Sequence, residues 1–334
     1  MGDVLRTTAL LPKIRRKYPK VYINWVTLLS SAALLKGNPL IDQVLYWSPE
    51  TLEGLRVREF DIVLNVDKAP ESAGLAMSVI APDKRGFGLS RFGNIVPLNP
   101  EAEYMYYLGL DDDEKFYKNQ KTELELLAEA FGFEYQPDEY IVELDPDEKA
   151  MAQRFREAIP IESDEIAIGI NTGCSTLYPY KKLTVEYQAL IADRIVSDIP
   201  GTRILLLGGK EDTDRNHEIH QLAKTPVIQT PTTHGLRKGI IYEDACDLVI
   251  SGDSLGMHIA IGLKKEVVVW FGLSCPQEIE LFGRGTKIIS KVDCGPCWRR
   301  SCDKEPKCYD SVDPDEVIQA VKDGVERIRA QRSQ

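Results

Sequence analysis

The stretch CDLVISGDSLGMHIAIGLKKEVVVWFG, residues 246–272, indicates that this chain has an α/β fold. Two short apolar runs, residues 246–252 and 266–272, flank a segment whose apolar residues have helical spacing. Short apolar runs that alternate with helices are typical of parallel strands covered on both faces. The stretch therefore predicts a parallel sheet, and it places Asp253 at the turn from the first strand into the helix.

The same alternation extends over most of the chain. It predicts two doubly wound, Rossmann-like sheets in sequence, with an acidic, proline-flanked linker between them and domains over residues 1–150 and 151–334. In the second half, strands are expected at residues 165–171, 203–209 and 227–230, and a last helix at residues 312–330. In the first half, we expect strands at residues 21–27, 42–47, 60–66 and 76–80, a glycine-rich loop at residues 84–94 and a helix at residues 114–131.

The composition is that of a globular protein that does not bind nucleic acid broadly. The chain has 334 residues, of which 43% are hydrophobic and 28% charged, and its formal net charge is −11. Nucleic-acid binding needs a basic face, and the Lys and Arg residues here are scattered. No window approaches the run of about 18 apolar residues of a membrane helix. The N-terminus also lacks the pattern of a signal peptide, so we expect a cytoplasmic protein.

One basic segment, KIRRKYPK at residues 13–20, is a local exception to the acidic balance. The simpler interpretation is the end of a helix, where cations are favoured by the helix dipole. The alternative is a small patch that meets an anionic substrate or a membrane surface.

Loops at the strand ends of the second half have the chemistry of a nucleoside diphosphate site. Backbone N–H groups, hydroxyls and a cation bind phosphate, and an acid accepts hydrogen bonds from ribose. Each loop also has a plain structural explanation: Glu211 as a capping acid, Asp253 or Ser254 as a helix cap, and His258 as a packed helix residue. The candidate binding residues are Thr172, Ser175, Lys181, Glu211, Asp253, Ser254, His258, Gly272 and Ser274.

A second Gly-Asp pair stands at residues 2–3, directly after Met1. It precedes a stretch with helical spacing, as the pair at residues 252–253 does. Ligands bind at the carboxyl ends of the strands in doubly wound sheets. If the two halves face each other, the two Gly-Asp turns form opposite walls of one site.

These features together resemble glycosyltransferase family 9, the lipopolysaccharide heptosyltransferase-like enzymes of GT-B fold. The resemblance is carried, in the order of the family, by GDVLRTTALLPKIRRKYP (residues 2–19), YKKLTVEYQALI (180–191), LLLGGKED (205–212) and GDSLGMHIAIGLKKEVVVWFGLSCPQE (252–278). It implies two Rossmann-like domains that face each other across a cleft, residues 1–150 on the acceptor side and residues 151–334 binding the nucleotide sugar. Family members carry an apolar strand ahead of Gly-Asp, so we expect this first strand to be missing from the sequence.

The resemblance also implies an inverting transfer. A sugar, with heptose as the leading candidate, would pass from a nucleotide diphosphate donor such as ADP-heptose to a lipopolysaccharide-core or other glycan acceptor. By resemblance, Asp3 is the base and Lys181 contacts phosphate. Glu211 lies near the nucleoside, Asp253 and His258 hold the donor, and Thr7 and Thr8 lie on the acceptor side. The turn after Asp253 reads Ser-Leu-Gly where relatives have Gly directly after Ser, which leaves the sugar open.

The implied partners extend to the membrane. A lipid-linked acceptor would bring the protein to the inner face of the cytoplasmic membrane as a peripheral protein, and no nucleic acid is expected. The chemistry requires no cofactor. A divalent cation could assist the leaving diphosphate, but DDDE at residues 111–114 opens a predicted helix and reads as a capping feature.

A cluster of four cysteines lies just before the last helix, and the chain holds seven in total. Without a signal peptide, reduced thiols or metal ligands are expected in place of a disulfide framework. The cluster suggests two alternatives, a structural zinc or iron–sulfur cluster and free thiols. Its members are Cys294, Cys297, Cys302 and Cys308.

Two other functions remain open at this point. One is a sugar-nucleotide epimerase or hydrolase of the same architecture, which would act on the donor without an acceptor. The other is a non-catalytic nucleotide-sugar-binding protein, which would bind the donor irrespective of Asp3.

Overall fold

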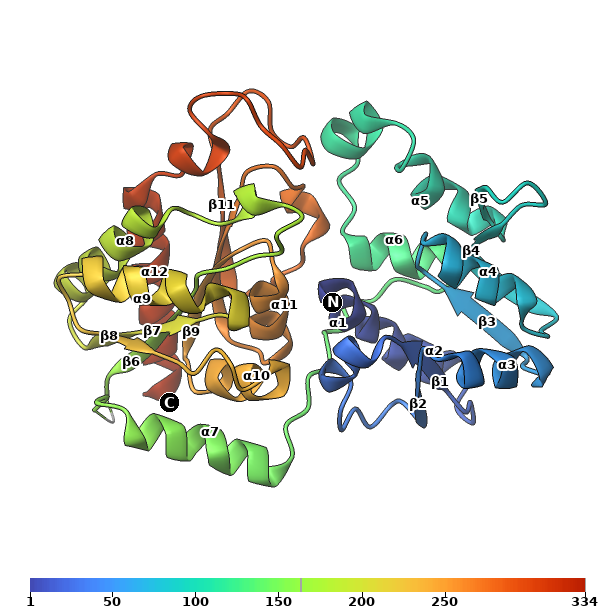
Figure 1. Ribbon diagram of the computed structural model, residues 1–334, viewed down its shortest axis with the longest axis horizontal. Coiled ribbons are helices and arrows are strands. Elements are labelled where there is room, and N and C mark those ends of the chain that lie inside the picture. Colours follow the sequence, from blue (N-terminus) through green and yellow to red (C-terminus); the bar gives the residue numbers. More distant parts are fainter. Residues whose placement is uncertain (163, 334) are drawn as a thin grey trace. The chain divides into compact units, whose positions relative to one another are not determined.

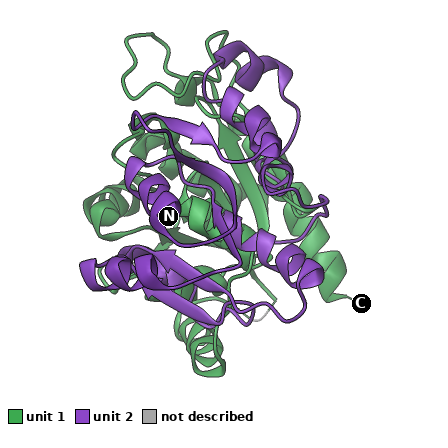
Figure 2. Cartoon of the chain, turned by 90° about the vertical axis from the view of Figure 1, so that its right-hand side faces the viewer, with its two compact units in different colours: residues 1–5, 140–276, 281–334 green, residues 6–139, 277–280 purple. Residues whose placement is uncertain are grey.

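The computed structural model describes residues 1–162 and 164–333, and the chain divides into two compact units (Figure 2). Unit 1 comprises residues 1–5, 140–276 and 281–334, and unit 2 comprises residues 6–139 and 277–280. The first five residues thus group with the C-terminal half. Helix α1 (Gly2–Thr7) begins in unit 1 and continues into unit 2.

Unit 1 contains a sheet of six parallel strands within the described residues, in the order β11-β10-β9-β6-β7-β8. The first strand in sequence, β6, lies in the middle, and the chain winds outward from it in both directions. This is the strand order of a Rossmann fold. The strands are β6 (Ile166–Asn171), β7 (Thr202–Leu207), β8 (Val227–Gln229), β9 (Leu248–Gly252), β10 (Glu266–Phe271) and β11 (Gly285–Ile289).

Helices cover both faces of this sheet (Figure 1). Helices α8 and α12 pack on one face, whereas α10 and α11 pack on the other. The apolar side chains of β6, β9 and β10 are buried along their whole length, as expected for parallel strands between two helical layers. The helices are α7 (Pro146–Ala158), α8 (Val185–Asp198), α9 (Thr213–Leu222), α10 (Leu236–Asp244), α11 (Leu255–Gly262) and α12 (Pro314–Arg332).

Unit 2 holds its strands in two separate sheets. Strands β1 and β2 form a parallel pair, while β3 pairs with β4 in parallel and β4 with β5 in antiparallel fashion. The strands are β1 (Asn24–Thr27), β2 (Gln43–Tyr46), β3 (Ile62–Asn65), β4 (Asp83–Leu89) and β5 (Ile95–Pro97). The helices are α2 (Leu11–Lys17), α3 (Pro49–Val57), α4 (Pro70–Ser78), α5 (Glu103–Tyr107) and α6 (Glu123–Ala130).

Burial differs between the two units. All four residues of β3 are half-buried, and β1 buries only Thr27. The apolar core of unit 2 instead gathers around α6 and Phe87, with Phe131 and Phe133 packed edge to face. The sheets of unit 2 are therefore less enclosed than the sheet of unit 1.

Three predictions for the first half are wrong. The helix expected at residues 114–131 is interrupted, because a short π-helical turn (Glu114–Lys118) and the non-helical residues 119–122 precede α6. Residues 76–80 are not a strand: α4 continues to Ser78 and buries Ala76, and beyond it Ile80 makes one isolated bridge. Residues 84–94 are not one loop, because β4 runs to Leu89. A β-carbon on Gly86 would lie 2.0 Å from the carbonyl oxygen of Asn65, so this glycine serves a close strand contact and not flexibility.

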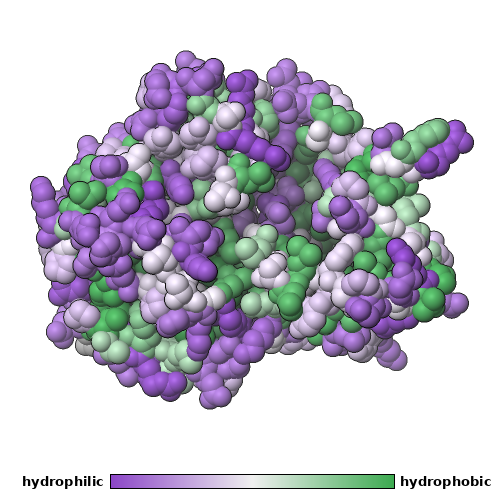
Figure 3. All heavy atoms as spheres, in the orientation of Figure 1, coloured by the Kyte–Doolittle hydropathy of each residue, from purple (hydrophilic) through white to green (hydrophobic). Residues whose placement is uncertain are grey.

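The surface of the chain carries both polar and apolar side chains. Figure 3 shows polar side chains over most of the face that it draws, with apolar side chains reaching the surface in both units. Among the described residues, no helix is both long enough and apolar enough to span a membrane.

Candidate active site

The candidate site lies where the winding of the unit 1 sheet reverses. Strands β6 and β9 are neighbours, and the chain leaves β6 toward β7 on one side and β9 toward β10 on the other. The loops that follow the two strands therefore diverge, and doubly wound sheets have a crevice between such loops at the carboxyl ends of the strands. Ligands of doubly wound sheets bind in such a crevice.

Asn171, the last residue of β6, ties these loops together. Its Nδ2 lies 3.1 Å from the carbonyl oxygen of Gly173, 3.0 Å from Oγ of Ser251 and 2.9 Å from Oγ of Ser254. One amide group thus links the loop after β6, the end of β9 and the cap of α11. The sequence analysis did not single out Asn171, although an asparagine at the end of a buried strand is a usable signal.

A lysine and an aspartate, 72 residues apart in sequence, meet in the crevice. Nζ of Lys181 lies 2.6 Å from Oδ2 of Asp253, and their side chains are only 12% and 11% exposed. The backbone makes this contact possible, because the carbonyl oxygen of Lys181 would lie 2.1 Å from a β-carbon on Gly252. The Gly-Asp pair therefore has two separate uses: the glycine admits the lysine loop, and the aspartate binds its ammonium group.

The surroundings of Asp253 keep it ionised. Burial by itself would raise the pKa of this carboxyl, but attraction to Lys181 and His258 and hydrogen bonds with Lys181 and Ser274 together hold the pKa below its ordinary value. A buried ion pair adds little net stability, since removing both charges from water offsets their attraction. The pair is better explained as a charged site that a ligand completes.

His258 lies one turn into α11 and is buried. Its ring packs against Tyr140, with the ring centroids 5.8 Å apart, and against the backbone of Gly2, on which a β-carbon would lie 2.5 Å from Cδ2 of His258. The predicted arrangement of two Gly-Asp turns in opposite halves is thus not what the contacts of unit 1 show. Gly2 and Gly252 both belong to unit 1.

The loop after β6 does not bring its two predicted hydroxyls, those of Thr172 and Ser175, together for a ligand. Thr172 is fully buried, and its single hydroxyl hydrogen is shared between the carbonyl oxygen of Leu207, 3.0 Å away, and the side-chain oxygen of Asn216. Ser175 is exposed, and its Oγ accepts a hydrogen bond from the N–H of Leu177. The structure therefore separates these two hydroxyls, one in the core and one at the surface.

Two neighbouring acids follow β7, and they face different surroundings. Glu211 is exposed, whereas Asp212 is buried and accepts a hydrogen bond from the N–H of Gly209 at 2.9 Å. A β-carbon on Gly173 would lie 2.1 Å from Oδ1 of Asp212, so this carboxylate lies directly on the loop after β6. Burial raises the pKa of Asp212. Glu211 is the predicted site residue of this turn, whereas Asp212 is not predicted.

The loop after β10 brings Ser274 and the cysteine segment to the same place. Ser274 is buried and hydrogen-bonds to Asp253. Gly272 faces Cys308, whose Sγ would lie 2.7 Å from a β-carbon on the glycine. The segment thus packs on the strand end next to the crevice.

The cysteines of this segment are free thiols in the structure. Cys294, Cys297, Cys302 and Cys308 are all half-buried and unbridged. Burial, followed by the neighbouring Cys297 and Cys302, raises the pKa of Cys308 to about 11. In residues 1–162 and 164–333, no group of three or more His, Cys, Asp or Glu side chains is placed to hold a metal. The described residues give the predicted zinc or iron–sulfur cluster no support.

The N-terminal candidates lie on or next to α1. Asp3 is exposed in the first turn of this helix. Thr7 is half-buried and Thr8 fully buried, and both belong to unit 2. The proposed roles of these three residues stay predictions.

Part of the charge of the basic segment at residues 13–20 is paired within unit 2. Lys13 is buried and lies 2.6 Å from Asp138, which also pairs with Arg16 at 2.6 Å. Arg15 pairs with Asp42 at 2.6 Å. Arg15, Arg16 and Lys17 form the last turn of α2, which agrees with the simpler interpretation as a helix end.

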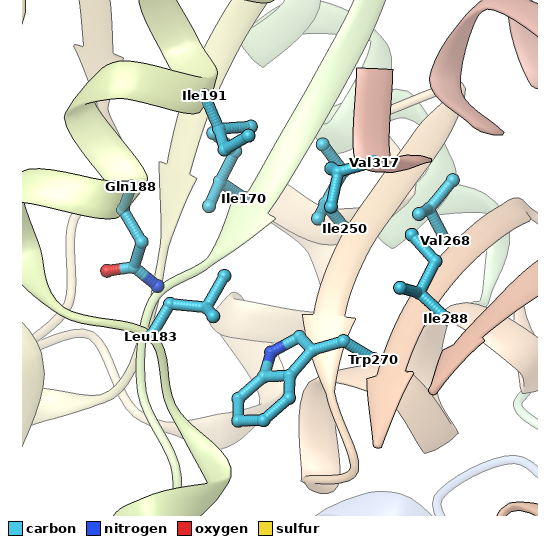
Figure 4. A pocket seen from close by; sticks show the side chains of 9 residues that line it. All are labelled: Ile170, Leu183, Gln188, Ile191, Ile250, Val268, Trp270, Ile288 and Val317. Atoms are coloured by element: carbon cyan, nitrogen blue, oxygen red, sulfur yellow. The ribbon is translucent and has the colours of Figure 1, made fainter. Parts of the chain in front are cut away.

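A small internal cavity of unit 1 is not a ligand site. It measures about 10 Å³ and lies among apolar side chains between the sheet and helices α8 and α12 (Figure 4). A cavity of this size holds at most about one water molecule, and its lining offers few polar partners. The lining residues are Ile170, Leu183, Gln188, Ile191, Ile250, Val268, Trp270, Ile288 and Val317.

Comparison with known proteins shows a match to one enzyme family over most of the chain. Residues 50–308 match the family model of glycosyltransferase family 9 (heptosyltransferase). Lipopolysaccharide heptosyltransferase 1 of Campylobacter coli is 23% identical over 351 residues, which cover 97% of this chain and 96% of that protein. A family 9 glycosyltransferase from Veillonella parvula DSM 2008 has a TM-score of 0.76 at 19% identity, over 99% of this chain and 94% of that one. The ADP-heptose lps heptosyltransferase II of E. coli has a TM-score of 0.69 at 18% identity, over 100% of this chain and 97% of that one.

The α/β architecture and these likenesses define a glycosyltransferase of GT-B fold. The match covers most of the chain, which therefore belongs to glycosyltransferase family 9. The resemblance inferred from the sequence motifs is confirmed.

Proposed function

We propose that this glycosyltransferase moves heptose from ADP-heptose to a lipopolysaccharide-core acceptor. The observation that carries the proposal is the buried pair of Lys181 and Asp253 at the carboxyl ends of β6 and β9. A cation in that crevice suits a diphosphate. The choice of sugar, nucleotide and acceptor is supported by the names of the relatives in Campylobacter coli and E. coli.

The proposed step is a displacement with inversion. The acceptor hydroxyl oxygen forms a bond to the anomeric carbon while the bond from that carbon to the diphosphate oxygen breaks. The carboxylate of Asp3 takes the hydroxyl proton. The departing ADP keeps the electron pair of the broken bond, and the ammonium group of Lys181 stabilises its charge. Asp253 holds that ammonium group where the diphosphate leaves, and the hydrogen bond from Ser274 and the attraction of His258 keep Asp253 ionised.

Domain roles follow from this scheme. We assign the donor to the domain of residues 151–334 and the acceptor to residues 1–150. The switch point of the unit 1 sheet supports the first assignment. The second rests on the family, together with the strongly exposed apolar side chains of unit 2, among them Val57 at 77% and Phe92 at 74%, which suit a lipid-linked acceptor.

The experiment that tests the function is a transfer assay with purified protein, ADP-heptose and a lipopolysaccharide acceptor that lacks its heptose. Mass spectrometry should show the acceptor heavier by one heptosyl residue and release of an equal amount of ADP. The matched control is Lys181→Met, which keeps most of the length of the unbranched side chain and removes its charge. An unmodified acceptor with the unchanged protein would overturn the proposal.

The same assay without acceptor separates transfer from the alternative function. An epimerase or hydrolase would consume ADP-heptose by itself, whereas we expect ADP release only when the acceptor is present. Repeating the assay after treatment with a chelator tests the proposal that no metal or other cofactor is required. Full activity should remain.

Peripheral membrane contact is part of the proposal. Phe92 lies in the turn between β4 and β5, 74% exposed, with the guanidinium of Arg91 stacked 4.6 Å from its ring centroid. An exposed aromatic ring beside a cation suits the interface of an anionic bilayer. Co-flotation with anionic vesicles should occur with the unchanged protein and decrease in Phe92→Asp. Equal flotation of both proteins would exclude this contact.

A further inference from the structure

The ammonium group of Lys181 has an aromatic neighbour that the reaction scheme does not use. Its Nζ lies 4.1 Å from the ring centroid of Trp298 and 5.5 Å from that of Tyr178. The two rings meet edge to face, with their centroids 5.6 Å apart. The lysine is therefore held between the Asp253 carboxylate and an aromatic wall.

Trp298 belongs to the cysteine segment, and its place is fixed by several contacts. The N–H groups of Cys297 and Trp298 both donate to the carbonyl oxygen of Leu273 at 2.9 Å. The indole N–H lies 3.4 Å from Sγ of Cys275, which is buried. The segment is thus anchored to the loop after β10, the same loop that supplies Ser274 to Asp253.

The backbone of Trp298 is also strained. Its φ is +49°, in the left-handed region that residues with a β-carbon rarely adopt. Such strain persists where the surrounding structure demands it, and it is concentrated at functional sites. The two hydrogen bonds to Leu273 hold the strained turn, and the turn directs the indole ring toward the lysine.

The ring of Trp298 can hold the ammonium group of Lys181 while the diphosphate binds, which the carboxylate of Asp253 cannot do. A lysine side chain is a flexible four-carbon stem with a point charge. If Asp253 alone held the ammonium group, an incoming diphosphate would compete with it for the same N–H donors. A ring face attracts the cation without accepting those hydrogen bonds in the way that a carboxylate does. The ammonium group then keeps its place while its donors turn to phosphate oxygens.

We propose that Trp298 is a positioning residue that holds Lys181 for the donor diphosphate. This inference rests on the proposed function, because it takes Lys181 as the group that binds the diphosphate. It gives the cysteine segment a role in donor binding that involves no metal. A second cation, Arg300, stacks 5.9 Å from the ring centroid of Tyr178 and extends the same aromatic group outward.

The test is a double-mutant cycle on nucleotide binding. Calorimetry measures the affinity for ADP and for adenosine in the unchanged protein, Trp298→Leu, Lys181→Met and the double variant, with GDP, UDP, CDP and TDP and their nucleosides as further probes. A desolvated cation–π contact corresponds to about a thirty-fold change in affinity. We expect Trp298→Leu to weaken ADP binding on that order and to leave adenosine binding unchanged. In the Lys181→Met background, Trp298→Leu should have no further effect.

Two controls separate positioning from a structural role. Trp298→Phe keeps a ring face and should restore most of the ADP affinity, and Trp47→Leu removes a half-buried tryptophan from unit 2 and should change nothing. Equal weakening of ADP and adenosine in Trp298→Leu would mean that the residue only supports the fold. Independent effects of Trp298→Leu and Lys181→Met on ADP would also overturn the inference.

The outcomes distinguish this inference from the proposed function. If the unchanged protein binds none of the nucleoside diphosphates, both fall together. If it binds one of them and transfers heptose, but the effects of the two substitutions multiply, only the role of Trp298 is wrong.

Discussion

A β-carbon on Gly2 would lie 2.5 Å from Cδ2 of His258, so the glycine of the first Gly-Asp pair rests on the histidine that faces Asp253. The second pair is built in the same way, since Gly252 rests under the carbonyl oxygen of Lys181. In both pairs the glycine admits another part of unit 1 at close range. The acid that follows is then placed by a contact that no larger residue would allow.

Gly2→Ala should therefore weaken the protein and its donor binding. The added methyl group meets the His258 ring below any normal contact distance, and forced packing of this kind costs about 1–3 kcal/mol. Displacing the ring also changes the electrostatic surroundings of Asp253. Urea unfolding and ADP affinity measure the two effects.

Gly239→Ala is the matched control for this substitution. Gly239 lies within α10, and a β-carbon there would meet no atom within 4 Å. Alanine in a helix interior is favoured over glycine by about 0.5–1 kcal/mol. We expect a small gain in the free energy of unfolding and unchanged ADP affinity. Equal behaviour of the two variants would show that the contact between Gly2 and His258 is unimportant.

Lys181→Met should reduce transfer and stability together. Loss of one charge-stabilising group in an active site typically lowers kcat by about 10²–10³-fold. The substitution also leaves Asp253 buried and unpaired, which costs about 3 kcal/mol. Steady-state kinetics and urea unfolding measure both losses.

The variant that combines Lys181→Met with Asp253→Asn separates the two losses. With both charges removed, much of the stability should return because no buried charge is left unpaired. Transfer should stay low because the cation is still missing. Recovery of activity in the double variant would show that Lys181 does not stabilise the leaving group.

Reactivity of Cys308 should depend strongly on pH. Its pKa is raised to about 11 by burial and by the neighbouring Cys297 and Cys302, so the thiol stays protonated in the folded protein at neutral pH. Only the thiolate reacts with iodoacetamide. Mass spectrometry should therefore show slow alkylation of Cys308 at pH 8 and fast alkylation only near its raised pKa.

The raised pKa of Cys308 also makes the free energy of unfolding depend on pH. An ordinary cysteine has a pKa of about 8.5, so the unfolded chain loses this proton before the folded chain does. Between that value and the folded pKa of about 11, the free energy of unfolding should fall as the pH rises. Cys308→Ser should remove this part of the dependence. An unchanged slope would show that the thiol titrates normally.

Asn171→Leu should loosen the crevice. The substitution keeps the branched shape of the side chain and removes the amide from its partners, the hydroxyls of Ser251 and Ser254 and the carbonyl oxygen of Gly173. Unsatisfied buried groups of this kind cost about 1–3 kcal/mol. Ser254→Ala removes one of these partners and should cost less. Urea unfolding measures the loss of free energy of unfolding in each variant. If the losses of the two single variants add fully in the double variant, Asn171 does not act through Ser254.

The sequence predicts the parallel strands of unit 1 well, because their burial on both faces leaves a direct trace in the residue pattern. Its errors in unit 2 have different causes. Gly86 and Gly88 read as a loop, yet they lie in β4, where a neighbouring backbone and side chains approach them closely. A single sequence does not display such tertiary contacts. Ala76 and Met77 read as a strand because they form the end of the nine-residue helix α4.

In the candidate site, too, the sequence indicates single residues but not the contacts between them. Lys181 and Asp253 could each be selected from their loops, but their pairing requires the order of β6 and β9 in the sheet. The choice between Glu211 and Asp212 depends on the turn after β7, which buries the second acid and exposes the first. The contact of Trp298 with Lys181 could not be predicted, because the two residues are far apart in sequence.

The different burial of the two sheets has a consequence for hydrogen exchange. Amide protons of β9 and β10, enclosed on both faces, should exchange only when unit 1 unfolds as a whole. Those of β1 and β3, half-buried in short separate sheets, should exchange through local opening at a much lower free energy. The proposed donor site thus lies in the slowly exchanging part of the molecule, while the part assigned to the acceptor can open and close many times between two global unfolding events.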